Sequence, residues 1–413
     1  MNVEYEPLSP RWRDDPYPVY RELRDQDPVH FAPEAEMFCI SRHADVSHAL
    51  AQPELYSSVA MNSVLTDFGP IGPRVAVALL RTRINPFELR RRGSLISMDA
   101  PRHDALRAIL NRGFVPRRIA AWEPRAREIV RDALRAWRPG EPFDLVEGLA
   151  SPLPVTIIAE MLGVEPERHR DFKRWSDAII GLSSGAARKD PAASGLLGEL
   201  SDLYIYLKEC VRERKRTPAL DLVSLLVDPS REDSLDELDV IQFVTLLLVA
   251  GNETTTNLIG NAVHALLRHP DQLARVAEDP QLVPGLVEET LRYDAPVQVA
   301  FRQTTRELSL CGTRIPKDAV VALLLGSANR DERVFEDPDR FDITRETRGH
   351  LGFGFGPHFC MGAALARLVA RVALEAVTPE LPGAKLVGET PALVDSFLVR
   401  GRVRLEVERA QRA

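Results

Sequence analysis

The feature that most constrains this chain is a glycine-rich loop that holds one cysteine and leads directly into a helix. Residues 353–362 read FGFGPHFCMG, and the cysteine is Cys360. Glycine lets a backbone take conformations closed to other residues and lets a bulky group come close to it. A thiol just before a helix N-terminus feels the positive end of the helix dipole, which favours the metal-ligating thiolate. The loop therefore indicates a ligand cysteine, and a buried structural cysteine is the alternative.

The pattern Phe353-x-x-Gly356-x-x-x-Cys360-x-Gly362 resembles the haem-thiolate loop of the cytochrome P450 family, in which the cysteine is the axial iron ligand. The resemblance implies haem b (iron protoporphyrin IX) as cofactor, with Cys360 as its metal ligand. It also implies the fold of that family, which is mainly α with a smaller β region, a triangular helical prism enclosing the haem. We expect a single domain over residues 1–413.

Composition and charge limit the class of protein. With 413 residues, 45% of them hydrophobic and 27% charged, the chain has ample material for a core. A formal net charge of −7 argues against nucleic-acid binding. The N-terminus shows no leader, and no run approaches the ~18 apolar residues of a membrane span, so we expect a bacterial-type soluble enzyme without a membrane anchor. Four widely spaced cysteines fit a reducing cytoplasm.

Local patterns predict the elements of the first half of the chain. Residues 16–27 are typical of a short amphipathic helix, residues 29–42 of a hairpin, and residues 43–52 of another helix. Residues 53–97 have no clear period but hold apolar side chains, which indicates a packed loop. In the resembled family this region covers the substrate. Residues 119–230 are nearly all helical in pattern.

A histidine and an arginine share one face of a predicted helix. Pro101 suits the first turn, which places His103 and Arg107 four residues apart. Such a pair alone is usually a surface pair. The resemblance implies that both hydrogen-bond haem propionates, as do matching residues Arg302 and His358, because two carboxylates at a pocket edge need cationic donors.

One unusually long helix is predicted from Ser234 to about Leu267. Ser234 and Glu237 form a capping box at its start. Gly251 and the threonines at 254–256 are poor helix formers at its middle, which indicates a kink or a widened turn.

The middle of this helix resembles the oxygen-binding groove of the family. In that resemblance Ala250 and Gly251 leave room for dioxygen, the hydroxyl of Thr254 hydrogen-bonds it, and Glu253 belongs to the proton-delivery route. The alternative is a kinked core helix whose threonines bond back to carbonyls one turn earlier.

A carboxylate and a guanidinium lie three residues apart on a helix predicted within 282–294. Most such pairs are weak surface bridges. Glu289 and Arg292, however, match the E-x-x-R signature of the family, which implies a buried structural pair. Arg340 or Arg345 would complete it.

Strand patterns follow. We expect strands at 297–302, 307–311 and 319–325, a helix at 361–378 behind the cysteine loop, and a turn at 395–398. The resemblance implies that this turn touches the substrate.

The resemblance implies a monooxygenase that hydroxylates a mostly apolar small molecule, such as a terpenoid, steroid, fatty acid or polyketide, with O2. Thiolate ligation favours O–O cleavage. The expected substrate pocket draws on apolar side chains from three regions, namely Phe243, Leu247, Val249, Val297, Ala300 and Phe397.

The two electrons must come from a separate ferredoxin or flavodoxin with its reductase, because the chain has no dinucleotide-binding loop and no iron–sulfur cysteine cluster. Arginines at 102, 112, 117 and 118 would meet the acidic face of this partner, with ordinary solvated surface as the alternative. We expect a monomer.

Two other functions compete. A peroxide-driven haem-thiolate enzyme needs no redox partner, but such family members typically lack the acid–threonine pair that Glu253 and Thr254 form here. A haem-binding sensor would be non-catalytic. Partner-dependent product formation separates the monooxygenase from both.

Overall fold

The computed structural model describes residues 3–61, 82, 85, 88, 91–183, 193–228, 230, 233–388 and 391–410. The chain divides into two compact units. The first comprises Met1–Met61, Glu123–Ser151 and Thr254–Ala413, and the second comprises Asn62–Trp122 and Pro152–Glu253. Most of the loop predicted over 53–97 lies outside the described residues, and the single domain over 1–413 stays a prediction.

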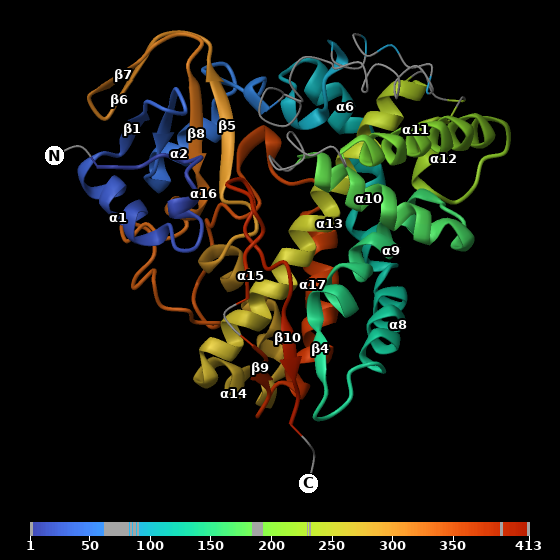
Figure 1. The fold of residues 1–413 in the computed structure, drawn as a ribbon. Helices are drawn as coiled ribbons and strands as arrows, with labels where there is room; N and C mark the ends of the chain where they lie inside the picture. The colour runs from blue at the N-terminus through green and yellow to red at the C-terminus, as the bar shows by residue number, and fades with distance from the viewer. Residues whose placement is uncertain are drawn as a thin grey trace. The chain divides into compact units, whose positions relative to one another are not determined.

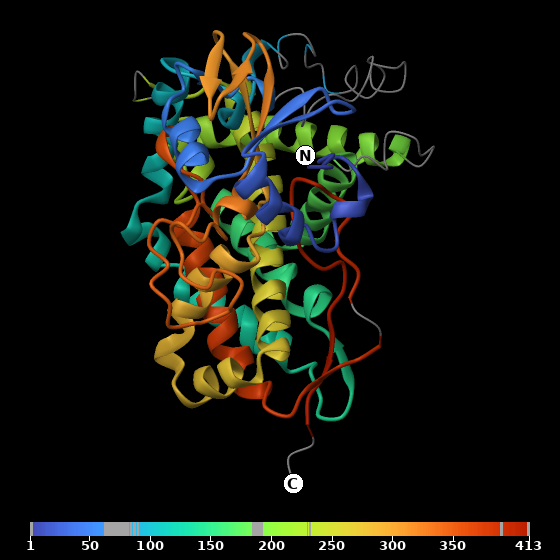
Figure 2. The same cartoon turned by 90° about the vertical axis from the view of Figure 1, so that its left-hand side faces the viewer.

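A five-stranded sheet is the β region of the first unit. Its order is β1-β2-β8-β5-β3, with β2 parallel to β8 and the other neighbours antiparallel. Figure 2 shows the blue hairpin of β1 and β2 beside the orange strands β5 and β8. The strands are β1 (Val29–Ala32), β2 (Met37–Ile40), β3 (Tyr56–Ser57), β5 (Val299–Thr304) and β8 (Val320–Leu324).

Two helices flank the hairpin in sequence, α1 (Tyr17–Gln26) and α2 (His43–Ala51). The buried side chains Val46 and Leu50 of α2 join Ile40 and Val321 of the sheet in one apolar cluster. The predicted helix, hairpin and helix over residues 16–52 are therefore confirmed, because each has its own local apolar period.

Helix α17 (Ala363–Val377) follows the cysteine loop (Figure 1). It packs against α8 (Glu123–Leu134) and α15 (Val283–Tyr293), and the predicted helix at 361–378 is confirmed. The first unit also contains α14 (Pro270–Glu278) and the short α16 (Leu325–Ala328), which contacts α1 and α2.

Two small sheets complete the first unit. One is formed by β4 (Pro142–Asp144), β10 (Glu406–Glu408) and β9 (Lys385–Leu386), the other by β6 (Leu308–Leu310) and β7 (Thr313–Ile315). Strand β4 interrupts the region predicted as nearly all helical. It forms because its partner β10 arrives from the far end of the chain, which no local pattern can show.

The second unit is helical. Helices α10 and α11 pack against each other, and α9 packs against α10 with eight of its eleven residues buried. The helices are α6 (Arg102–Asn111), α7 (Pro116–Ala120), α9 (Pro152–Leu162), α10 (His169–Ser183), α11 (Ala193–Arg216) and α12 (Leu222–Leu226).

Helix α13 (Glu237–Arg268) has 32 residues and contributes to both units. The predicted capping box is wrong. The helix begins at Glu237, and Asp236 caps it, because its Oδ1 accepts a hydrogen bond of 2.9 Å from the amide of Asp239. The predicted widened turn is also wrong, since α13 stays α-helical throughout. Tertiary packing of its buried faces outweighs the low helix propensity of its middle.

Candidate functional site

The cysteine loop is held in shape by two glycines and by backbone hydrogen bonds. Gly354 and Gly356 have φ values of 71° and 70°, the left-handed region that favours glycine. A Cβ at Gly356 would lie 2.7 Å from the carbonyl oxygen of Leu50, at the end of α2. The amide of Cys360 donates to the carbonyl oxygen of Phe353 across 2.9 Å.

This loop places Cys360 at the N-terminus of α17. Gly362 is the N-cap residue, and the amide of Ala363 donates to the carbonyl oxygen of Cys360 across 3.3 Å. The helix dipole therefore favours a thiolate at this partly exposed position. A Cβ at Gly362 would lie 3.9 Å from Sγ of Cys360, which is an ordinary van der Waals contact.

The other three cysteines are poor candidates for a ligand. Burial raises the pKa of Cys39, and it raises the pKa of Cys210 to about 11. Burial and the nearby carboxylate of Asp45 raise the pKa of Cys311. All three are held as thiols, whereas Cys360 alone lies at a helix N-terminus in a glycine-rich loop.

The predicted propionate-binding residues lie in both units. In the first unit, Arg302 of β5 is buried and donates from Nη1 to the carbonyl oxygen of Phe301 across 2.8 Å. His358 lies in the turn before Cys360, with its Nε2 2.9 Å from Oγ of Ser58. The contact with Ser58 was not foreseen, because nothing in the local sequence of β3 points to it.

In the second unit, His103 and Arg107 lie one turn apart on α6, as predicted. His103 is buried, and its Nδ1 lies 2.8 Å from Oδ1 of Asp104. Arg107 is partly buried. Imidazole and guanidinium groups are suitable donors to haem carboxylates, and a cysteine thiolate is a suitable iron ligand, so the types of side chain found in each unit fit haem.

The middle of α13 presents an acid and a hydroxyl next to each other. Burial raises the pKa of Glu253, and Thr254 beside it is partly buried. Ala250 is exposed although the helix around it is mostly buried. A Cβ at Gly251 would lie 2.8 Å from Cδ1 of Ile158, so this glycine lets α9 approach α13 closely.

Helical spacing places the apolar residues of α13 that were predicted to contact substrate on two different faces of the helix. Phe243 and Leu247 share one face with Ala250 and Thr254, because the intervals are four, three and four residues. Val249 lies on another face of the helix. The sequence could have separated Val249 from the others by this periodicity alone.

Asn252 makes a buried hydrogen bond that the sequence analysis did not predict. Its Nδ2 donates to Oγ of Ser176 on α10 across 3.0 Å, and both residues are buried. A polar residue amid an apolar helix was the available signal, because a buried amide needs hydrogen-bond partners.

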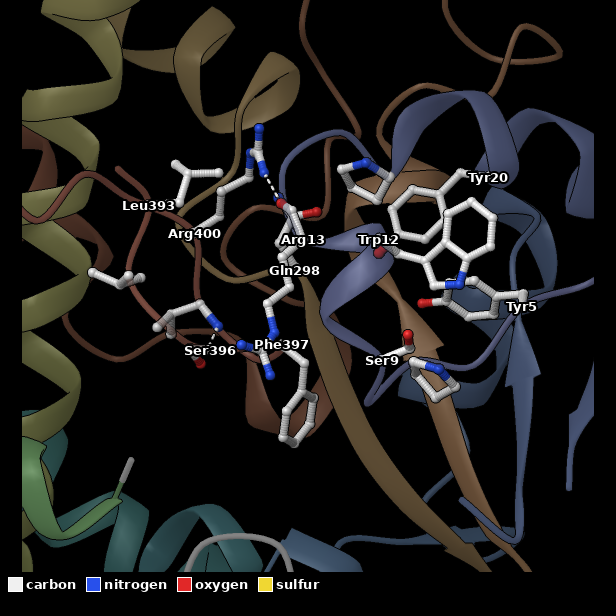
Figure 3. A pocket seen from close by; sticks show the side chains of 14 residues that line it. Tyr5, Ser9, Trp12, Arg13, Tyr20, Gln298, Leu393, Ser396, Phe397 and Arg400 are labelled. Atoms are coloured by element: carbon white, nitrogen blue, oxygen red, sulfur yellow. Dashed lines mark hydrogen bonds between the residues drawn. The ribbon is translucent and has the colours of Figure 1, made fainter. Parts of the chain in front are cut away.

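A small pocket in the first unit is lined by the N-terminal segment and the C-terminal tail (Figure 3). Tyr5, Trp12 and Arg13 face Gln298 and Phe397 across it. The ring of Phe397 lies 5.8 Å from that of Phe301. A volume of about 30 Å³ accommodates water but no organic substrate. Of the predicted substrate residues, Phe397 lines this pocket, and Val297 and Ala300 do not.

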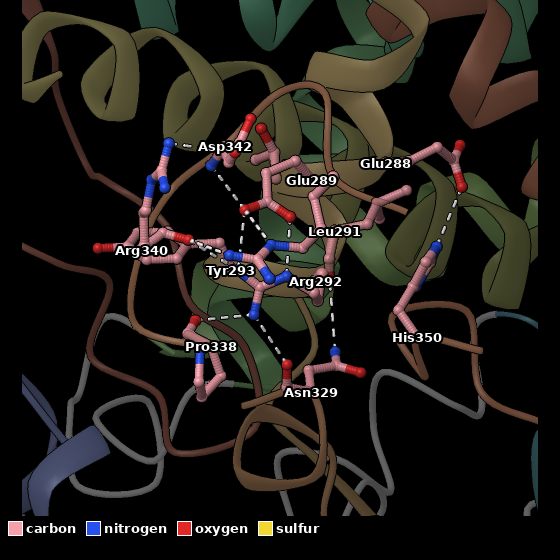
Figure 4. Close-up of polar contacts among 12 residues, drawn as sticks. Glu288, Glu289, Leu291, Arg292, Tyr293, Asn329, Pro338, Arg340, Asp342 and His350 are labelled. Atoms are coloured by element: carbon pink, nitrogen blue, oxygen red, sulfur yellow. Dashed lines mark hydrogen bonds and ion pairs between the residues drawn. The ribbon is translucent and has the colours of Figure 1, made fainter. Parts of the chain in front are cut away.

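The E-x-x-R pair is buried, as predicted (Figure 4). Arg292 donates from Nε and Nη2 to the two oxygens of Glu289 across 2.7 and 2.8 Å. Its Nη1 donates to the carbonyl oxygens of Asn329 and Pro338. Arg345 completes the cluster, with Nε 3.5 Å from Oε1 of Glu289.

Arg340, the other candidate, contributes its backbone carbonyl, which accepts from Arg292 across 3.2 Å, while its side chain is exposed. The cluster ties α15 to the chain segments that precede the cysteine loop.

Three known proteins show what this chain resembles. It is 39% identical over 419 residues to the vitamin D(3) 25-hydroxylase of Pseudonocardia autotrophica, which covers 99% of this chain and 98% of that relative. The structure of cytochrome P450 CYP109Q5 from Chondromyces apiculatus is similar with a TM-score of 0.88, at 37% identity over 100% of both chains. That of CYP109E1 from Bacillus megaterium in complex with corticosterone has a TM-score of 0.82, at 31% identity over 97% of this chain and 100% of that one.

Residues 201–378 also match the family described as Cytochrome P450. These likenesses define a haem-thiolate oxidoreductase. The chain belongs to the cytochrome P450 family, whose bacterial members bind haem b through a cysteine thiolate, and it is a monooxygenase. The predicted fold, mainly α with a smaller β region, is confirmed. None of the helices formed by the described residues is both long and apolar enough to cross a membrane.

Proposed function

We propose that Cys360 holds the haem iron and that this monooxygenase hydroxylates an apolar polycyclic molecule of the steroid kind. The single observation that carries the proposal is the loop geometry: two left-handed glycines and the Cys360–Phe353 hydrogen bond present one thiolate at the start of α17. The likeness to a vitamin D(3) hydroxylase and to a corticosterone complex supports the class of substrate.

Haem b bound through a thiolate supplies the activation of dioxygen. Residues of this chain would bind the haem and supply the protons. Arg302, His358, His103 and Arg107 would bind its carboxylates, because each offers an N–H donor at the end of a buried or partly buried side chain.

Glu253 and Thr254 form the proton route. Because burial raises the pKa of Glu253, its carboxyl keeps a proton at a higher pH than an exposed glutamate does. Thr254 Oγ1 would pass protons on to dioxygen activated at the haem, with Glu253 as their source. Ala250 and Gly251 carry no bulky side chain next to this pair.

The substrate would contact Phe243 and Leu247 of α13 together with Val297, Ala300 and Phe397, whereas Val249 lies on another face of the helix. All of these residues are apolar, and Phe243 and Leu247 share the helical face of Thr254. A mostly apolar surface selects an apolar molecule, and the few polar groups orient it.

Electrons would come from a ferredoxin or flavodoxin with its reductase, in the cytoplasm, and the enzyme would act as a monomer. Two of the four arginines assigned to this partner already have carboxylates of their own: Arg102 pairs with Asp239, and Arg112 with Asp233. Arg117 and Arg118 of α7 form no ion pair with any described residue, which leaves them for the acidic face of the partner.

The test replaces Cys360 by serine in the holoprotein. We expect Cys360→Ser to lose the reduced carbon-monoxide spectrum of thiolate ligation and all partner-dependent product from a steroid panel. Cys311→Ser, which alters an exposed cysteine in a hairpin turn, is the matched control and keeps both. A Cys360→Ser protein that retained the spectrum and the product would refute the proposal.

A further inference from the structure

A charged cluster lies in the first unit beside the first residue of the cysteine loop. Arg367 of α17 donates from Nε and Nη2 to the two oxygens of Glu288 on α15, across 2.6 and 2.9 Å. Its guanidinium carbon lies 4.5 Å from the ring centroid of Phe353. A cation at this distance is attracted by the ring face, so Arg367 holds the Phe353 side chain while Glu288 holds Arg367.

His350 also contacts the carboxylate of Glu288. Its Nε2 lies 3.0 Å from Oε2 of Glu288, as Figure 4 shows, and the amide of Gly352 donates to its Nδ1 across 3.1 Å. Since Nδ1 accepts, Nε2 carries the hydrogen, and His350 is a neutral donor to the carboxylate. Burial raises the pKa of Glu288, but the hydrogen bonds from Arg367 and His350 outweigh it and hold the pKa at about 2.

The cluster reaches the cysteine along two routes. Through the backbone, the carbonyl oxygen of Phe353 accepts the amide hydrogen of Cys360. Through space, the pKa of Arg367 is raised first by its hydrogen bond to Glu288 and, to a smaller extent, by the charge of a Cys360 thiolate. A guanidinium held against Phe353 would act on a thiolate at position 360 as a fixed positive charge, screened in part because the Arg367 side chain is partly exposed.

We propose that Arg367 and Glu288 are positioning residues that set the reduction potential of the haem iron: Arg367 holds a cation beside the thiolate and Phe353, and Glu288 partly neutralises that cation. The inference rests on the proposed role of Cys360 as iron ligand. Reduction adds an electron near the thiolate, so a positive charge there favours the reduced iron and a negative charge opposes it.

Opposite signs distinguish this electrostatic role from a purely structural one. Arg367→Gln removes the cation and leaves Glu288 unpaired, so the potential falls. Glu288→Gln removes the anion and leaves Arg367 unpaired, so the potential rises. A pair that only braced the loop would shift the potential in the same direction whichever partner was removed.

The experiment is a spectroelectrochemical titration of the holoproteins. We expect Arg367→Gln to lower, and Glu288→Gln to raise, the ferrous-to-ferric ratio at a fixed potential by about tenfold, which is about 59 mV for one electron. The double variant returns close to wild type, and Arg367→Lys, which keeps the charge, stays near it. If Arg367→Gln yields no holoprotein, Glu288→Gln and Arg367→Lys decide: a ferrous-to-ferric ratio unchanged in Glu288→Gln, or lowered about tenfold in Arg367→Lys, overturns the proposal.

Arg371→Gln is the matched control. Arg371 lies one turn further along α17 and forms ion pairs with Glu123 and Glu375 instead. We expect it to lower stability and leave the potential unchanged. Shifts of the same sign in Arg367→Gln and Glu288→Gln, or none, overturn the proposal while the carbon-monoxide spectrum remains that of a thiolate. Absence of that spectrum from the wild type would instead refute the role of Cys360.

Discussion

Two buried charge clusters stabilise the first unit, and they differ in how far apart in the sequence their members lie. In the first, Glu289 and Arg292 lie three residues apart on one helix and are completely buried. In the second, Asp294 lies just after that helix and accepts from Nε of Arg400 and the hydroxyl of Tyr17, across 2.7 and 3.0 Å. The members of the first cluster lie between residues 289 and 345, whereas the second cluster joins the two ends of the chain.

The second cluster fastens the N-terminal segment to the C-terminal tail. Nη1 and Nη2 of Arg400 donate to the carbonyl oxygens of Arg13 and Asp14 across 2.6 and 2.8 Å. Arg402 adds a second guanidinium, with Nη1 3.5 Å from Oδ2 of Asp294. One buried carboxylate thus faces two buried cations, so Asp294 is the member whose loss leaves most charge unpaired.

The largest loss of stability is expected for the pair of Glu289 and Arg292, whose side chains are completely buried. Glu289→Gln leaves the guanidinium of Arg292 without its carboxylate in a site closed to water, which costs about 3–5 kcal/mol of unfolding free energy. Urea denaturation of the holoprotein measures this loss. Glu4→Gln, which removes the carboxylate of an exposed pair with Arg11, is the control and leaves the urea midpoint in place. Equal midpoints for both variants would contradict a buried structural pair.

The second-largest expected effect is the contribution of Asp294 to folding stability, which depends on pH. Burial raises the pKa of Asp294, but Arg400 and Arg402 outweigh it and hold the pKa at about 2, below the ordinary value of 3.8. A lowered folded-state pKa stabilises the fold above pH 3.8, and the stabilisation is lost as pH falls through about 2. The difference corresponds to about 2 kcal/mol.

Asp294→Asn should therefore destabilise the protein at neutral pH, by less than Glu289→Gln, and flatten the loss of stability between about pH 4 and pH 2. Thermal midpoints of the wild type and the variant across this range are the measurement. Parallel curves for the two proteins would show that Asp294 is not held ionised by the two arginines.

The same contrast explains what the sequence could reveal. The cysteine loop and the E-x-x-R pair were predictable because their residues lie within ten and four positions of each other, so each forms a short continuous motif that can be matched to a known family. The contact of Gly251 with Ile158, the bond from Asn252 to Ser176 and the salt bridge of Asp294 with Arg400 join residues that are between 76 and 106 positions apart. Contacts between such distant residues leave no periodic pattern in the sequence.

The smallest expected effect on stability distinguishes Arg345 from Arg340 as the third member of the cluster of Glu289 and Arg292. Arg345 has a side chain only 12% exposed near Glu289, and its Nη2 donates to the carbonyl oxygen of Asp337 across 2.9 Å. The Arg340 side chain is 62% exposed and pairs with Asp342. Arg345→Met should therefore cost about 1–2 kcal/mol of unfolding free energy, and Arg340→Met less than about 0.5 kcal/mol. Thermal midpoints of the two holoproteins decide, and a reversed order would mean that the carboxylate of Glu289 is neutralised by Arg292 alone.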